Sequence, residues 1–134
     1  MFDFTEKMDK IRANNLSPVV LAYVGDAVYT LFVREKFIFQ ADYKPNDLNK
    51  LAVNEVKATA QAELVSEIKE MFTEEEAAIY RRGRNAKKTS RTKAASAADY
   101  NSSTGFEAVL GFLYLTGNID RINYLLNRGK TEWK

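Results

Sequence analysis

Two long apolar segments, each holding a single charged residue, limit what this chain can fold into. Residues 17–33 contain only Asp26 as a formally charged residue, and residues 100–119 contain only Glu107. Long apolar segments without strict alternation favour buried helices. The rest of the chain shows amphipathic helical spacing and no alternating strand pattern. The sequence therefore predicts an all-α helical bundle.

Capping signals place the first long helix. Ser17 suits the N-cap and Pro18 the first helical position, so a buried helix is expected over residues 19–33. A loop at about residues 41–44 should follow, and Pro45 should open the next element. These positions set the start of the bundle.

The middle of the chain carries a helical period and then a stop. Apolar residues recur at three- and four-residue spacings over residues 48–68, which predicts one amphipathic helix. Thr73 and Glu76 have the spacing of a capping box, so a short helix should begin there. Gly83 is expected to end it in a left-handed conformation.

The last third is expected to contain a loop and two helices. Residues 85–98 lack periodicity and should form a loop, which precedes a strongly apolar helix over 104–116. A break at 117–118 leads to an amphipathic helix over 119–127. The tail after Gly129 should be frayed.

The composition excludes several kinds of catalytic and metal-binding chemistry. The 134 residues include neither Cys nor His, which excludes disulfides, cysteine nucleophiles, histidine-based catalysis and conventional zinc sites. With no repeat or linker, one domain over residues 1–134 is expected. We also expect no signal peptide, no membrane span and a cytoplasmic location.

The two lone acids are the first candidates for a functional site. A buried, unpaired carboxylate costs several kcal/mol or becomes neutral. If the two helices pack together, Asp26 and Glu107 could share a Mg²⁺ ion, for which Mn²⁺ could substitute. Alternatively, either acid faces solvent or pairs with a distant Arg. Gly25 and Gly111 favour a close helix crossing, although each could simply be tolerated at about 1 kcal/mol.

A second candidate site is a basic segment. Residues 81–98 hold seven basic and no acidic residues, and because the net charge is +2, the remainder carries −5. The segment contains no aromatic residue, and small hydroxyl-bearing residues lie among its basic ones. It therefore suits phosphate contacts better than base stacking. It could instead be a solvated run that aids solubility. We expect a flexible basic loop at about 84–99, and the candidate residues for contacts with the phosphates of a nucleic-acid duplex are Arg81, Arg82, Arg84, Lys87, Lys88, Arg91 and Lys93.

Five motifs, in order, resemble the ribonuclease III family. Residues 21–28 (LAYVGDAV) resemble its signature helix, and residues 106–111 (FEAVLG) resemble its second metal-binding helix. Residues 44–48, 73–76 and 82–87 resemble segments of the Mini-III ribonucleases. These form the short branch without a separate double-stranded-RNA-binding domain. The resemblance extends from about Leu16 to Arg128.

The resemblance implies a function as well as a fold. It implies a homodimeric, all-α endonuclease domain in which each subunit cuts one strand of duplex RNA, leaving 5′-phosphate and 3′-hydroxyl ends. The implied substrate is a stem in precursor 23S ribosomal RNA, and assistance from a ribosomal protein is left open. Val19, Ala22 and Thr104 stand where longer relatives carry further acids, which matches the short branch and leaves the number of metal ions open.

The combined hypothesis gives each candidate a role. Asp26 and Glu107 would hold the catalytic cation, which activates water, while the basic segment holds the duplex. The helix over residues 19–33 is the leading candidate for the dimer contact. Two alternatives remain: a non-catalytic helical RNA-binding or ribosome-associated domain, and a helical protein-interaction module whose apolar helices form only a dimer core.

Overall fold

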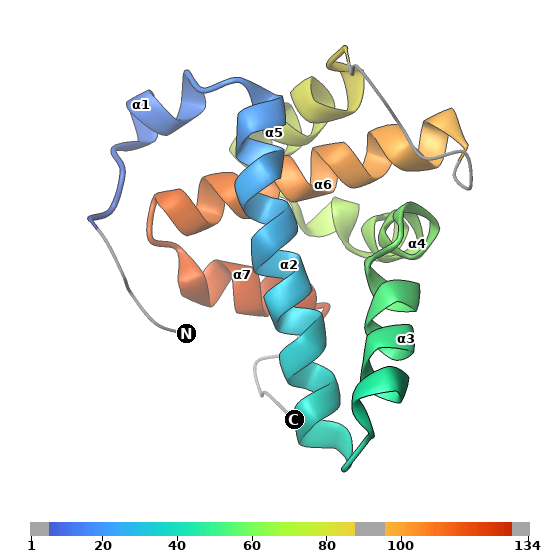
Figure 1. Ribbon diagram of the computed structural model, residues 1–134. Coiled ribbons are helices and arrows are strands. Elements are labelled where there is room, and N and C mark those ends of the chain that lie inside the picture. Colours follow the sequence, from blue (N-terminus) through green and yellow to red (C-terminus); the bar gives the residue numbers. More distant parts are fainter. Residues whose placement is uncertain (1–5, 88–95, 130–134) are drawn as a thin grey trace.

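The computed structural model describes residues 6–87 and 96–129, in which every regular element is a helix. In Figure 1, α2 runs across α6, and α3 and α4 stand beside them. The all-α prediction is confirmed. No helix in the described ranges is long and apolar enough to cross a membrane. In chain order the elements are α1 (Lys10–Asn14), α2 (Pro18–Gln40), α3 (Pro45–Val56), α4 (Ala58–Ile68), the 3-10 helix η1 (Lys69–Met71), α5 (Glu74–Asn85), α6 (Ala97–Leu115) and α7 (Ile119–Leu126).

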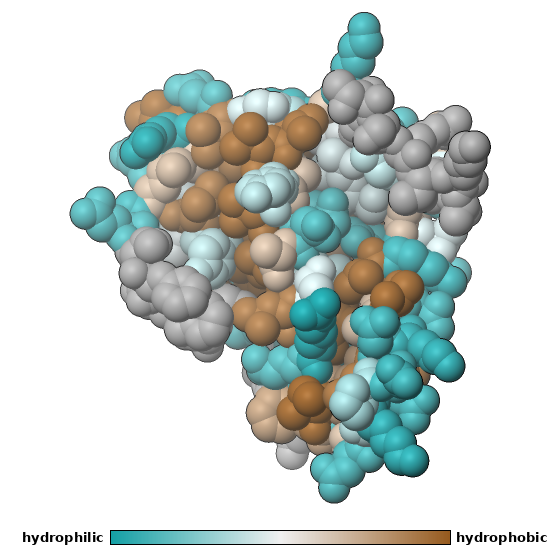
Figure 2. All heavy atoms as spheres, in the orientation of Figure 1, coloured by the Kyte–Doolittle hydropathy of each residue, from teal (hydrophilic) through white to brown (hydrophobic). Residues whose placement is uncertain are grey.

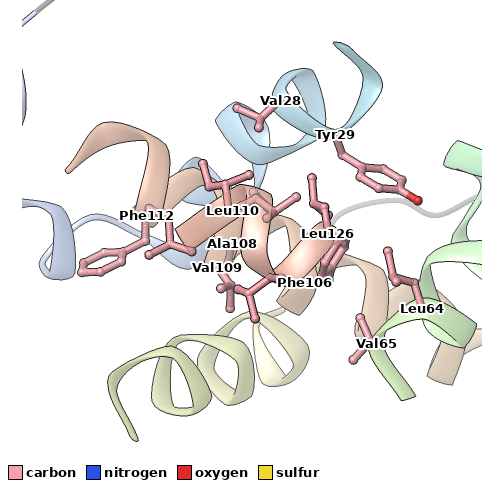
Figure 3. Packing of buried hydrophobic residues seen from close by; sticks show 14 of the residues in the cluster. Val28, Tyr29, Leu64, Val65, Phe106, Ala108, Val109, Leu110, Phe112 and Leu126 are labelled. Carbon is pink, nitrogen blue, oxygen red and sulfur yellow. The ribbon is translucent and has the colours of Figure 1, made fainter. Parts of the chain in front are cut away.

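Helix α6 is the centre of the core. Phe106, Val109 and Leu110 on α6 are fully buried and meet side chains from the helices around it (Figure 3). The Tyr29 ring of α2 packs edge-on against Phe106, with 5.3 Å between ring centroids. Burial of α6 on several sides explains why residues 108–115 of this helix are apolar all round rather than along one stripe.

Glycines allow α2 and α6 to approach with their backbones in contact. A Cβ atom on Gly25 would lie 1.7 Å from the carbonyl oxygen of Glu107, and one on Gly111 would lie 1.9 Å from that of Leu21. Such distances are impossible for real atoms, so any side chain here would force the helices apart. Of the two interpretations of these glycines, close packing is correct.

Gly83 does not end α5, contrary to the sequence prediction. The helix continues to Asn85, and Gly83 faces Gly105 of α6, where an added Cβ would lie 2.8 Å from the Gly105 Cα atom. A glycine at a helix crossing and one at a helix end look alike in sequence. The tertiary contact decides between them.

The amphipathic segment 48–68 forms two helices rather than one. Lys57 adopts an extended conformation (φ −66°, ψ 156°) between α3 and α4, and the Gln61 side chain donates a hydrogen bond to the carbonyl of Val56 at 2.7 Å. This bond satisfies a carbonyl that the break leaves without a helical partner. The apolar spacing survives the break, so periodicity alone did not reveal it.

The segment between α5 and α6 is shorter in the structure than the loop predicted at 84–99, and the difference arises at both ends. Residues 84–85 belong to α5, and α6 begins at Ala97 rather than at Thr104. Ser96 caps α6 by accepting a hydrogen bond from the backbone N–H of Asp99 at 3.0 Å. That Ser-x-x-Asp spacing is a helix-start signal that the sequence prediction overlooked. Residues 88–95 lie outside the described part, so the expected flexibility stays a prediction.

Other helix boundaries follow their predicted caps. Ser17 accepts a hydrogen bond from the N–H of Val19 at 3.2 Å, at the start of α2. The break before α7 is confirmed at Gly117, which has a positive φ of 79°. The short α1, capped by Asp9, was not predicted. The expected frayed tail lies beyond the described residues.

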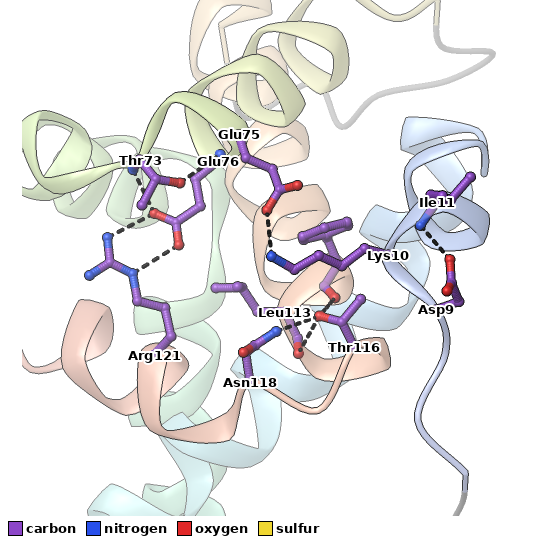
Figure 4. Close-up of polar contacts among 11 residues, drawn as sticks. Asp9, Lys10, Ile11, Thr73, Glu75, Glu76, Leu113, Thr116, Asn118 and Arg121 are labelled. Atoms are coloured by element: carbon purple, nitrogen blue, oxygen red, sulfur yellow. Dashed lines mark hydrogen bonds and ion pairs between the residues drawn. The ribbon is translucent and has the colours of Figure 1, made fainter.

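The predicted capping box also takes part in a tertiary ion pair. Thr73 and Glu76 exchange side chain to backbone hydrogen bonds at 2.9 and 3.1 Å. The buried Glu76 carboxylate also accepts two hydrogen bonds from Arg121 of α7, each 2.8 Å long (Figure 4). Arg121 donates a third to the carbonyl of Met71. The start of α5 is thereby fixed to α7.

Candidate active site

The two lone acids meet at the crossing of α2 and α6. Asp26 follows Gly25, whose Cα hydrogens face the carbonyl group of Glu107 itself. The two carboxyl groups lie close enough to share a hydrogen bond. Packing of two glycine-bearing helices thus brings together acids that stand 81 residues apart in the sequence.

Burial makes this acid pair costly when both groups are ionised. Glu107 is half-buried, and its pKa is raised to about 8, first by burial and then by the charge of Asp26 and a hydrogen bond with it. A hydrogen bond from Gln61 opposes this rise. Asp26 lies at the exposed edge of the pair. At neutral pH the pair needs either a proton or a cation beside it.

Oxygen donors around the pair suit a hard divalent cation. Among the residues the structure describes, no group of three or more Asp, Glu, His or Cys side chains could hold a metal ion. The ligands available here are the two carboxylates, and the Gln61 amide lies beside them, its Nε2 donating to Glu107 Oε2 at 3.1 Å. Mg²⁺ commonly uses only one or two carboxylates and keeps several waters. The residues present therefore fit such an ion.

The ribonuclease III domain family matches residues 19–118, a range that includes both acids. The chain belongs to the ribonuclease III family. It is 46% identical to a Mini-ribonuclease 3 from Thermoanaerobacter sp. (strain X514) over 91% of this chain and 86% of that protein. It is 45% identical to a Mini-ribonuclease 3 from Symbiobacterium thermophilum, with 83% and 85% covered. A crystal structure of a Fusobacterium nucleatum protein superposes with a TM-score of 0.79 at 30% identity, covering 90% and 96%.

These relatives confirm the resemblance to the ribonuclease III family and to its Mini-III members. The shared fold is confirmed by the same matches and by the helical architecture. As a ribonuclease III family member with such relatives, the chain is an endoribonuclease.

The basic residues that were predicted to bind RNA differ in their surroundings in the structure. The Arg82 guanidinium connects α5 to the end of α1 and the residues after it, donating to the carbonyls of Asn14 and Leu16 at 3.1 and 3.2 Å. Arg81, Arg84 and Lys87 have exposed side chains. The Arg84 guanidinium lies over the Tyr80 ring, 5.7 Å from its centroid. Lys88, Arg91 and Lys93 fall outside the described residues.

Gln61 contacts the acid pair through Glu107, and sequence reasoning did not single it out. It occupies the buried stripe of α4 with Leu64, Val65 and Ile68, and only 2% of it is exposed. A neutral polar residue in an otherwise apolar stripe was the available signal. Its partner Glu107 lies 46 residues away, so the sequence gave no reason to join the two.

Proposed function

We propose that this chain is a divalent-metal-dependent endoribonuclease that cuts double-stranded RNA with Asp26 and Glu107. The observation that carries this proposal is the meeting of two carboxylates from apolar helices in a chain of the ribonuclease III family. When bound, a Mg²⁺ or Mn²⁺ ion would make a water molecule more acidic and neutralise charge on the cleaved phosphate. The products would carry 5′-phosphate and 3′-hydroxyl ends.

The residues of the chain have separate tasks in this proposal. Asp26 and Glu107 bind the cation, and the approach of α2 to α6 at Gly25 fixes the spacing of the two side chains. Burial of Glu107 keeps its carboxylate away from bulk water, which strengthens its attraction for a cation. Because the Glu107 proton must leave before the cation binds, affinity should rise as the pH approaches 8.

A nuclease assay tests this function directly. Purified protein incubated with duplex RNA and Mg²⁺ should cut it, EDTA should stop cutting, and single-stranded RNA of the same sequence should persist. A precursor 23S ribosomal RNA stem, the substrate class we propose for the cell, should be cut at a defined position. Mg²⁺-dependent duplex binding without any cleavage would favour the non-catalytic alternative instead.

The exposed basic residues lie at the end of α5, which packs on α6 close to the acid pair. Gly83 packs on Gly105, two residues before Glu107, so the last turn of α5 lies beside the part of α6 that leads to the site. Arg81, Arg84 and Lys87 project from this end of α5 and the residues after it. We propose that they contact phosphates of the duplex, together with Lys88, Arg91 and Lys93. Arg82 would support them by holding α5 in place.

Neutralising Arg84, Lys87 and Lys88 together to Gln should weaken duplex binding and reduce its salt dependence. Each lost phosphate contact lowers the slope of log affinity against log salt by roughly one. Fluorescence anisotropy in EDTA at several salt concentrations measures this slope. The exposed Lys69, changed to Gln, serves as the control for loss of charge alone. An unchanged slope in the triple variant would remove this segment from the RNA contact.

An uncovered apolar stripe on α2 supports a homodimer. Val20, Tyr23 and Ala27 recur at helical spacing and are exposed, with 82% of Tyr23 accessible. Figure 2 shows apolar surface gathered over the first half of α2. A two-fold axis along this stripe would give two equivalent sites, one for each strand of a duplex. We propose that the enzyme is a homodimer of single-domain chains and acts in the cytoplasm. Assistance by a ribosomal protein is a separate proposal.

Changing Tyr23→Asp should convert the dimer to a monomer, because it would bury an unpaired charge between the subunits at a cost of several kcal/mol. Sedimentation velocity over a concentration series measures the change. Phe39→Asp is the matched control, since Phe39 is 75% exposed but lies near the other end of α2. A Tyr23→Asp protein that remains dimeric would place the contact elsewhere.

A further inference from the structure

Gln61 is a polar residue at a position where α4 otherwise buries apolar side chains. Its neighbours on the same face, Leu64, Val65 and Ile68, are almost completely buried, and Gln61 itself is 2% exposed. Burying an amide costs free energy unless its polar atoms find partners. Its place in the core therefore calls for a physical reason, which its contacts supply in part.

The amide nitrogen of Gln61 joins the backbone to the acid pair. Nε2 donates one hydrogen bond to the carbonyl oxygen of Val56 at 2.7 Å and another to Glu107 Oε2 at 3.1 Å. Val56 is the last residue of α3, so one side chain satisfies the end of that helix and also orients Glu107. Both N–H groups of the amide are used, and its oxygen, Oε1, is buried without a donor.

This arrangement suits an oxygen-lined cation site better than a purely structural hydrogen bond. A purely structural role would need only the two hydrogen bonds of Nε2. It would leave the buried side-chain oxygen of Gln61 without a partner, which costs about 1–3 kcal/mol. A neutral amide oxygen adds an acceptor for a cation, or for its waters, without adding a third negative charge to Asp26 and Glu107. The amide nitrogen meanwhile stabilises the ionised form of Glu107, the form that binds cations.

We propose that Gln61 is a positioning residue of the cation site, holding Glu107 through its amide nitrogen and contributing its amide oxygen to the acceptors around the ion. The inference rests on the proposed function. It assigns part of the site to α4, so that three helices rather than two build it. Groups that orient metal ligands in this way typically change metal affinity by 10- to 100-fold when removed.

The test is the affinity of the whole protein for Mn²⁺ alone, measured by isothermal titration calorimetry without RNA. Gln61→Met keeps the length of the side chain and removes both polar atoms, and we expect it to bind Mn²⁺ roughly 10- to 100-fold more weakly. Val65→Ala is the control: it lies one turn along α4, is 1% exposed, and should lower the melting temperature without changing Mn²⁺ affinity. Wild-type affinity in a folded Gln61→Met protein would overturn the inference.

Two further variants separate the possible failures. Asp26→Asn should also lose Mn²⁺ binding; if it binds as the wild type does, the proposed cation site itself is wrong. If Asp26→Asn loses binding and Gln61→Met keeps it, only the role of Gln61 is wrong. Should Gln61→Met not fold, Gln61→Glu keeps the oxygen but cannot donate to Glu107 when ionised. It should bind Mn²⁺ at least as tightly as the wild type yet cut more slowly, and wild-type cutting would overturn the positioning role.

Discussion

Asp26→Asn should reduce RNA cleavage by about 10³-fold while leaving the fold intact. The variant removes one of two charged ligands, and a catalytic metal contributes several kcal/mol of transition-state stabilisation, each 1.36 kcal/mol being worth tenfold in rate. Because the charge of Asp26 helps to raise the pKa of Glu107, its removal relieves repulsion in the metal-free protein. The melting temperature in EDTA should therefore equal or exceed that of the wild type.

Single-turnover cleavage of duplex RNA in Mg²⁺ measures the loss of activity. Duplex affinity in EDTA should be unchanged, because Asp26 contributes no positive charge to RNA binding. Glu35→Gln is the matched control: it neutralises an exposed acid on the same helix and should cut at the wild-type rate. Substantial Mg²⁺-dependent cleavage by Asp26→Asn would rule out the assigned role.

Gly111→Ala should destabilise the whole protein, because there is no space for one added methyl group. The new Cβ would lie 1.9 Å from the carbonyl oxygen of Leu21, and the neighbour is helix backbone, which cannot rotate away. Overpacking of a core commonly costs 1–3 kcal/mol, and this contact should cost at least the upper end of that range. A drop in melting temperature of roughly 10 °C is expected for a domain of this size.

Thermal unfolding followed by circular dichroism measures this effect. Asn49→Ala, at an exposed position within α3, is the control for adding a good helix former where nothing is crowded. It should leave the melting temperature unchanged or slightly higher. If Gly111→Ala unfolds at the wild-type temperature, α2 and α6 are not in backbone contact. Because the same contact positions Glu107, any remaining folded variant should also bind Mn²⁺ less tightly.

Much of the fold was predictable because its signals are local. Ser17 with Pro18, and Thr73 with Glu76, are capping patterns whose hydrogen bonds form within a few residues. Two of the errors occurred where one sequence pattern is compatible with two structures. Gly83 was assigned to a helix end and instead lies at a crossing, and the break at Lys57 left the apolar period intact.

The candidate site was predictable in its charges but not in its surroundings. Asp26 and Glu107 stand out because each is the only charged residue in a long apolar segment. Gln61 and Arg82 could not be assigned in the same way. The first joins Glu107 from 46 residues away, and the second binds carbonyls more than 60 residues away.

By itself the sequence determined that the chain is helical, where several of the helices begin, and which two acids stand alone in long apolar segments. Only the tertiary structure decided that α2 and α6 cross at Gly25 and Gly111, that Gln61 of α4 donates to Glu107, and that Arg82 donates to the carbonyl of Asn14. The reason is physical: residue spacing reports the surface that one helix presents, whereas a site depends on which other surface packs against it.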